Sequence, residues 1–152
     1  MCQFLPRRGR TEGLRRQLLL PQIPETGCTV EAVTEESAFR WAERYNERFA
    51  AVPSAQSCGP FEARRLAKQG ECFFVLEDGA PAGLGRVRGS RLLALASLRP
   101  GAGERTLFAL ARQCGLQKID LTCAMENTRA MAFYDRLGFT RGPVTQRWYA
   151  VG

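Results

Sequence analysis

The sequence contains no histidine, and this absence removes several mechanisms together. Histidine is the commonest general base in enzymes and one half of every Ser-His or Cys-His nucleophile pair. It is also a frequent zinc ligand, and the six cysteines include no C-x-x-C pair that would replace it. We therefore expect a protein without histidine-based catalysis and without a metal site, whose thiols are free, as in a reducing cytosol.

Long hydrophobic runs are missing as well. No stretch approaches the roughly 18 apolar residues that a membrane-spanning helix requires. The first 20 residues lack an apolar segment followed by a small-residue cleavage site, so we expect no secretory signal. A length of 152 residues with 45% apolar residues suits one globular domain with its own core. These features predict a cytoplasmic protein that does not associate with membranes, and they leave a homodimer open.

Acidic residues are in the minority, 15 against 22 lysines and arginines, which gives a net charge of +7 and favours anionic partners. A surplus of +4 lies in the first 20 residues, which hold five arginines and one glutamate. Nucleic acid ranks last among such partners, because aromatic residues do not alternate with these arginines. We expect residues 1–27 to be a basic extension and residues 28–152 to be the domain. The extension is interpreted as a mobile or loosely docked tail, with an organelle transit peptide as the alternative.

From residue 28 onward, the apolar residues follow the spacing of strands and helices in turn. Strands are predicted over 28–34, three times between 71 and 98, over 118–125 and over 139–151. Helices are predicted over 35–52, 61–70, 103–115 and 128–138, with Thr34 and Asn127 as N-caps and glycines after three of them. The order β-α-α-β-β-β-α-β-α-β predicts an α/β fold of the α+β kind, a mixed sheet covered by helices on both faces.

The most specific pattern is "NTRAMAFYDRLGF", residues 127–139. It places an Asn at the start of a helix and a Tyr about two turns further on, on a similar side of that helix. Together with the order of elements, it resembles the GNAT superfamily of acyl-CoA-dependent N-acyltransferases, whose C-terminal signature is N-x-x-A-x-x-F-Y-x-x-x-G-F. The resemblance extends from about residue 28 to the end, and the matching positions are Asn127, Ala130, Phe133, Tyr134, Gly138 and Phe139.

This resemblance implies a GNAT-like fold, with a central, mostly antiparallel mixed sheet, and an N-acetyltransferase that moves an acetyl group from acetyl-CoA to a primary amine. The strand before Asn127 would diverge from its neighbour, and the gap would hold the pantetheine arm as an added strand does. Asn127 would hydrogen-bond the pantetheine or order the helix, and Tyr134 would protonate the leaving thiolate. The simpler interpretations are a plain N-cap for Asn127, a core aromatic for Tyr134, and packing for Ala130 and Phe133.

A second pattern, "SLRPGAGERTLFALA" over 97–111, has two glycines between a strand and a helix. By the resemblance, the backbone amides of such a loop bind the pyrophosphate of the cofactor, aided by the helix dipole. The match is imperfect, because Pro100 replaces the leading basic residue and Arg105 the closing small one. An ordinary turn is the alternative. The candidate cofactor-binding residues here are Leu98, Arg99, Gly101, Gly103, Glu104, Arg105 and Thr106, with the two arginines as partners of the phosphates.

A general base is not evident in the sequence. Acidic residues in or beside the predicted strands are Glu71, Glu77, Asp120 and Glu126, each of which is more often a solvated charge than a base. The missing base and the atypical glycine loop keep a second function open, a catalytically silent GNAT-like module that binds CoA or a protein partner. The sequence does not determine the amine acceptor.

Overall fold

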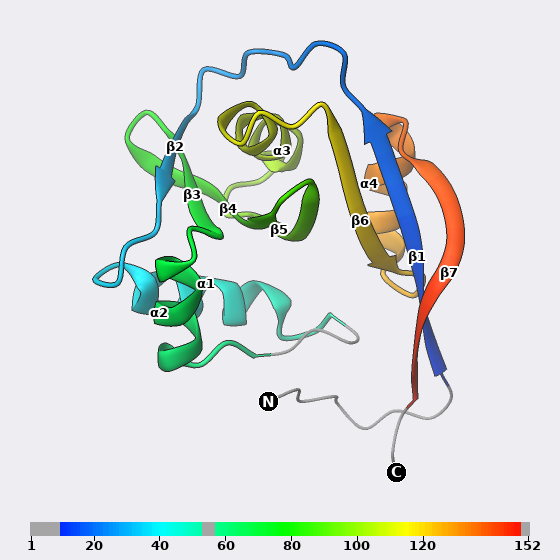
Figure 1. The fold of residues 1–152 in the computed structure, drawn as a ribbon, viewed down its shortest axis with the longest axis horizontal. Helices are drawn as coiled ribbons and strands as arrows, with labels where there is room; N and C mark the ends of the chain where they lie inside the picture. The colour runs from blue at the N-terminus through cyan, green and yellow to red at the C-terminus, as the bar shows by residue number, and fades with distance from the viewer. Residues whose placement is uncertain (1–9, 53–56, 150–152) are drawn as a thin grey trace.

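The computed structural model describes residues 10–52 and 57–149, which form a seven-stranded mixed sheet with four helices (Figure 1). The sheet order is β2-β3-β4-β5-β6-β1-β7. The strands are β1 (Arg10–Leu19), β2 (Thr29–Ala32), β3 (Cys72–Glu77), β4 (Ala80–Arg88), β5 (Arg91–Ser97), β6 (Lys118–Ala124) and β7 (Thr140–Tyr149). The helices are α1 (Ala38–Phe49), α2 (Pro60–Lys68), α3 (Gly103–Gln113) and α4 (Thr128–Leu137). From β2 onward, every predicted element is present in the predicted order.

Helices cover both faces of the sheet, as the order of elements predicted. On one face, α1 and α2 bury Trp41 and Leu66 against strand residues such as Leu84. On the other face, α3 and α4 form a second apolar cluster with the strands, centred on buried leucines of α3. The approach of α3 requires glycine in β4, because a Cβ on Gly85 would lie 2.3 Å from a methyl carbon of Leu110. Alternate residues of β4 therefore serve two different cores.

The strands β5 and β6 separate soon after they begin. They pair in parallel at Arg91 and Asp120, where the amide of Asp120 also donates to the carbonyl of Ser90 at 3.0 Å. No further residue pair joins these two strands, which lie wholly within the described part of the chain. All the other strand pairs are antiparallel. Divergence leaves backbone groups of β5 and β6 without a neighbouring strand, which is the gap that the resemblance implied.

The N-terminal segment is where the sequence-based expectation is wrong. Residues 10–19 are not a loosely docked extension but the strand β1, which lies between β6 and β7 and pairs antiparallel with both. Gly13 to Leu19 pair with Ala124 to Lys118, and Leu14 and Leu20 are buried in the core. Without β1, the strands β6 and β7 would have no connection through the sheet. Residues 1–9 lie outside the described residues.

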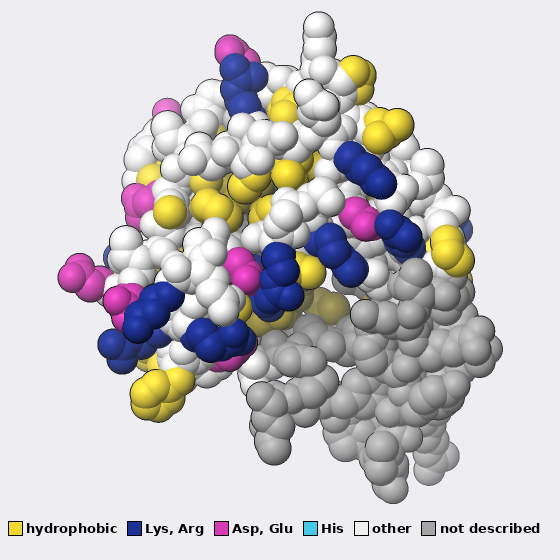
Figure 2. Space-filling view, viewed as in Figure 1, with side chains coloured by type: hydrophobic (Ala, Val, Ile, Leu, Met, Phe, Trp, Pro, Cys, Tyr) yellow, Lys and Arg dark blue, Asp and Glu magenta, His cyan; other side chains and the backbone are white. Residues whose placement is uncertain are grey.

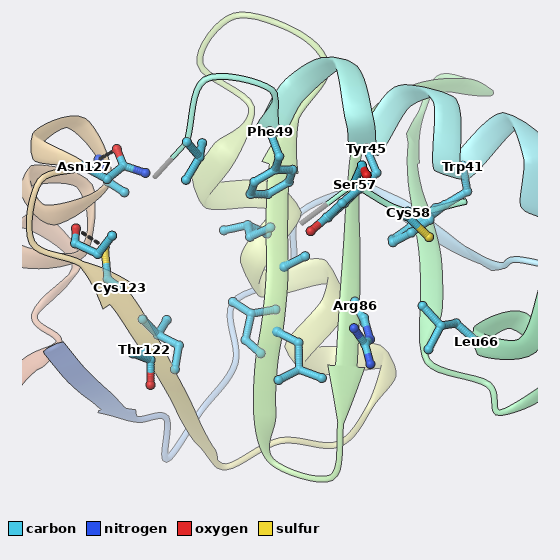
Figure 3. A pocket seen from close by; sticks show the side chains of 18 of the residues that line it. Trp41, Tyr45, Phe49, Ser57, Cys58, Leu66, Arg86, Thr122, Cys123 and Asn127 are labelled. Carbon is cyan, nitrogen blue, oxygen red and sulfur yellow. Dashed lines mark hydrogen bonds between the residues drawn. The ribbon is translucent and has the colours of Figure 1, made fainter. Parts of the chain in front are cut away.

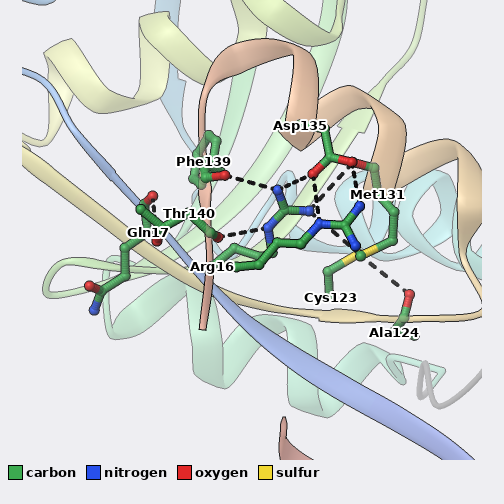
Figure 4. A network of polar contacts seen from close by, with 9 residues as sticks. Arg16, Gln17, Cys123, Ala124, Met131, Asp135, Phe139 and Thr140 are labelled. Carbon is green, nitrogen blue, oxygen red and sulfur yellow. Dashed lines mark hydrogen bonds and ion pairs between the residues drawn. The ribbon is translucent and has the colours of Figure 1, made fainter. Parts of the chain in front are cut away.

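Arg16 of β1 explains how this strand holds the C-terminal helix (Figure 4). Its side chain is completely buried, and it donates to the carbonyl of Thr140 at 2.9 Å and to that of Phe139 at 3.0 Å. It also bonds the carbonyl of Met131 in α4 and forms an ion pair with Asp135. A single guanidinium of β1 thus donates to carbonyls in α4, in the link that follows it and at the start of β7.

Helix ends are mostly where the sequence predicted them. Asn127 is the N-cap of α4, since its Oδ1 accepts from the amide of Ala130 at 3.2 Å, and Gly138 ends that helix with a φ of +90°. Thr34 is not an N-cap, because α1 begins three residues later than this assignment requires. Its hydroxyl instead accepts from the amide of Ser37, whose own hydroxyl accepts from the amide of Thr34. In the described ranges, no helix is long and apolar enough to cross a membrane.

Candidate active site

Two cavities meet at the gap between β5 and β6. The larger, about 1240 Å³, follows the end of β5, the loop to α3 and the first turns of α4. The smaller, about 430 Å³, lies between α1 and the strands β4, β5 and β6 (Figure 3). Residues that line both cavities mark the junction: Phe49, Val52, Leu95, Asn127, Ala130 and Tyr134. The two residues singled out by the signature therefore stand where the cavities join.

Tyr134 is half-buried at this junction. Its ring packs edge-to-face against Phe133 at 5.2 Å and against Phe139 at 5.0 Å between ring centroids, so its direction is fixed by neighbours on both sides. Burial raises the pKa of Tyr134 above its usual range, and the nearby Cys123 acts in the same direction. The phenol is therefore neutral at pH 7 and retains a proton that it can give away.

The loop before α3 has the geometry of an anion site. A turn brings the amide of Ala102 to the carbonyl of Arg99 at 3.2 Å, and Gly101 adopts a φ of +72° that other residues rarely take. The helix begins at Gly103, and its first amides have no intrahelical acceptor, so they are free to bind a negative charge. A Cβ on Gly103 would lie 3.1 Å from Cε1 of Phe133, so this glycine also lets α4 pack against the start of α3.

Arg99 and Arg105 share one carboxylate beside this loop. The Nη1 of Arg99 donates to Glu77 at 3.1 Å, and the Nη2 of Arg105 donates to the same oxygen at 3.0 Å. The hydrogen bond from Arg105, and then that from Arg99, lowers the pKa of Glu77. The cluster carries a net charge of +1 next to Gly101, whose carbonyl accepts from Arg105 at 3.0 Å. Of these two arginines, Arg99 lines the larger cavity, and its charge is shared with Glu77.

The structure gathers most of the predicted cofactor-binding residues around the larger cavity, but not all. Two of them, Arg105 and Thr106, do not contribute to the cavity wall. Arg105 does not line the cavity, because its guanidinium turns to Glu77. Thr106 is fully buried under β4, so close that a Cβ on Gly83 would meet its hydroxyl at 2.2 Å. The residues that do line the larger cavity are Leu98, Arg99, Gly101, Gly103, Glu104, Asn127, Ala130, Phe133 and Tyr134.

The sequence-based reasoning missed three arginines that line the larger cavity, Arg48, Arg129 and Arg136. The last two belong to α4, inside the signature, at positions where the signature specifies no residue. Arg136 lies 5.5 Å above the ring of Phe133, within the range of a cation–π contact. The proximity of Arg129 and Arg136 to Asn127 in the sequence was the signal that could have identified these two arginines.

Ion pairs hold Glu71, Glu77 and Asp120, which were considered as a base. Glu71 accepts from Arg86 at 3.0 Å and from Arg88 at 3.1 Å, and Glu77 binds the two loop arginines. Asp120 accepts both Nε and Nη2 of Arg15, which outweighs its burial and lowers its pKa. These carboxylates are stabilised in the charged form and are poor bases. The fourth acid, Glu126, lines the larger cavity.

No group of three metal-ligating side chains occurs in residues 10–52 and 57–149. The smaller cavity, which the sequence did not reveal, has an apolar wall on α1 formed by Trp41, Tyr45 and Phe49. Across from it, β4 contributes Arg86. Figure 2 shows basic and acidic side chains interspersed on the viewed face, with hydrophobic side chains visible in the hollow between them.

Comparisons with known proteins agree with this geometry. Residues 104–139 match the model of the acetyltransferase (GNAT) family. A GNAT-family acetyltransferase from Bacillus cereus is 13% identical, with a TM-score of 0.58 over 78% of this chain and 87% of that one. The aminoglycoside N-acetyltransferase AAC(6')-Iy, solved with CoA, is 14% identical, with a TM-score of 0.56 over 84% of this chain and 96% of that one.

A third solved structure, a protein from Drosophila, is 15% identical with a TM-score of 0.59. It matches over 92% of this chain, which spans only 50% of that protein's length. A search of curated proteins gave no match. The chain has the fold of the GNAT acetyltransferases, and the resemblance predicted from the sequence is confirmed.

Proposed function

We propose that the protein is an N-acetyltransferase that moves an acetyl group from acetyl-CoA to a primary amine. The observation that carries this proposal is the meeting of two cavities at the gap between β5 and β6, with Asn127 and Tyr134 at the junction. A transferase needs separate spaces for donor and acceptor that touch at the reacting bond.

The larger cavity suits the donor. The unpaired edge of β5 can accept the pantetheine amides as an added strand. The free amides at the start of α3, together with Arg99, Arg129 and Arg136, suit the phosphates. Asn127 uses its oxygen as the helix cap, and its Nδ2 makes no hydrogen bond with another described residue, so it remains a donor for the pantetheine.

The smaller cavity would deliver the amine to the thioester carbonyl. A C–N bond forms as the C–S bond breaks, and the Tyr134 phenol gives its proton to the departing thiolate. The amine nitrogen loses its extra proton to water. The ion pairs of Glu71, Glu77 and Asp120 support this assignment, because they disfavour proton uptake.

Acetyl-CoA binding is the first test. At a concentration of 100 times Kd, ligand binding raises the melting temperature of a domain of this size by roughly 5–10 °C. Asn127→Ser is the informative variant, because serine also caps helices but lacks the amide donors. We expect it to keep the melting temperature of the free protein and to bind acetyl-CoA up to about 10-fold more weakly.

Transfer is measured as thiol release with a panel of amines. Thiol release together with acetyl-CoA binding would support the transferase function. Binding without release for any amine would favour the alternative, a silent GNAT-fold module that binds CoA. If millimolar acetyl-CoA causes no shift in melting temperature and no thiol is released, the proposal is overturned. An interaction module would then be the better account.

A further inference from the structure

The smaller cavity contains a cation, Arg86, whose charge is not fully satisfied by the residues that the structure describes. Of the described residues that line it, Glu62 and Arg86 are charged. Glu62 accepts two hydrogen bonds from Arg65, so its charge is already paired on the surface of α2. Arg86 lies on the inner side of β4, opposite Ala94 of β5. Both residues line the cavity, and the alanine side chain is the smaller of the two.

One edge of the Arg86 guanidinium is fixed and the other is open. Its Nε donates to the buried Glu71 at 3.0 Å, which sets the orientation of the plane. Its Nη1 and Nη2 make no hydrogen bond with any described residue, although the side chain is only 25% exposed. Glu71 is shared with Arg88, so the three side chains carry a net charge of +1. A half-buried guanidinium with two free donors favours an anionic partner.

The opposite wall of the cavity is aromatic. Trp41, Tyr45 and Phe49 follow one another at intervals of four residues along α1, and their rings are stacked, with centroids 5.2 Å and 4.6 Å apart. The Trp41 indole is anchored to the carbonyl of Phe73 at 3.2 Å. Phe49 continues this surface to the junction with the larger cavity. An acceptor would therefore have apolar surface along its path from Arg86 to Tyr134.

We propose that the acceptor is an amine that also carries a carboxylate, which Arg86 binds through its two free nitrogens while apolar atoms lie against Tyr45 and Phe49. A carboxylate matches the planar fork of a guanidinium better than other anions do. The proposal rests on the proposed transferase function. The amine nitrogen forms the C–N bond and loses a proton to water as the C–S bond of the thioester breaks. The products are an N-acetylated amine that keeps its carboxylate, and CoA with its free thiol.

Matched acceptors test the carboxylate directly in the wild-type protein. Phenylalanine is compared with phenethylamine, and 6-aminohexanoate with hexylamine, by thiol release at saturating acetyl-CoA. We expect the carboxylate to raise kcat/KM about 10–100-fold in at least one pair, through KM. Sisomicin, found in one solved acetyltransferase of this fold, is polycationic and should be a poor acceptor. Equal rates within both pairs, or a preference for the amines without carboxylate, would overturn the proposal.

Variants then assign the effect to one residue. Arg86→Gln should abolish the preference for carboxylates, and Arg86→Lys should retain part of it. Arg88→Gln is the matched control, because Arg88 binds the same Glu71 but is 58% exposed and does not line the cavity. It should keep the full preference. If both glutamine variants keep the preference, or both lose it equally, Arg86 does not bind the acceptor.

A binding measurement separates this proposal from the transferase itself. If acetyl-CoA binds but no amine is acetylated, the proposed reaction fails while the Arg86 site can still be tested. N-acetylphenylalanine should then raise the melting temperature of the wild type and of Arg88→Gln, and N-acetylphenethylamine should not. Absence of that difference in the wild type would refute the carboxylate site, whatever the folding of the Arg86 variants.

Discussion

Arg16 offers the sharpest test of how the fold supports the site. Its guanidinium is completely buried and bonds the carbonyls of Thr140, Phe139 and Met131 as well as Asp135. Arg16→Ala would remove the guanidinium from these carbonyls, whereas Asp135 is 39% exposed and would keep Arg141 as a partner. It would also leave a cavity under α4, the helix that carries Tyr134.

The size of the effect follows from these contacts. A buried acceptor left without its donor costs about 1–3 kcal/mol, so the carbonyls of Phe139 and Thr140 together account for about 2–6 kcal/mol. For a chain of this length, that corresponds to a fall in melting temperature of about 4–24 °C. Arg141→Ala is the control, because Arg141 binds the same Asp135 but is 59% exposed. A surface pair contributes about 0–1 kcal/mol, so this variant should melt within a few degrees of the wild type.

The measurement is urea unfolding followed by tryptophan fluorescence and far-UV circular dichroism, with the midpoint and slope compared across variants. If Arg16→Ala and Arg141→Ala differ by less than about 1 kcal/mol, the buried network is not what secures β1 to α4. The same reasoning predicts that a chain starting at residue 28, which lacks β1, does not unfold cooperatively. A soluble, cooperatively folding truncation would contradict it.

Three further results are expected. Tyr134→Phe keeps the ring and removes the acid, so turnover should fall about 10²–10⁴-fold while the melting temperature stays nearly unchanged. If the variant keeps more than half of the wild-type turnover while chemistry is rate-limiting, Tyr134 is not the acid. Gly103→Ala displaces the ring of Phe133 and should weaken acetyl-CoA binding, which calorimetry measures. Gly59→Ala is the control and should not weaken it, because the added Cβ would meet open space. The pKa of Glu77 is depressed in the folded protein, so its contribution to stability is present above the unfolded pKa of about 4.3 and is lost as the pH falls through the folded value. Glu77→Gln should therefore lower the melting temperature more at pH 7 than at pH 3, and an equal loss at both would contradict this.

Local sequence determined the elements and the signature helix. Asn127 caps α4 and Gly138 ends it because both act on backbone groups only a few residues away. The divergence of β5 and β6 and the helices on both faces followed from the order of elements and from the resemblance, since neighbouring elements in the chain pack together.

Tertiary structure alone decided the place of β1, because its partners in β6 and β7 lie about a hundred or more residues away along the chain. An arginine-rich segment is normally solvated, and a buried Arg16 is favourable because Asp135 and the carbonyls of Phe139 and Thr140 are its partners. In the same way, Arg105 is turned from the larger cavity by a glutamate of β3, and Arg86 meets the aromatic face of α1 across the smaller cavity. The sequence specifies the type and charge of each residue, but contacts between distant segments determine which charges are neutralised.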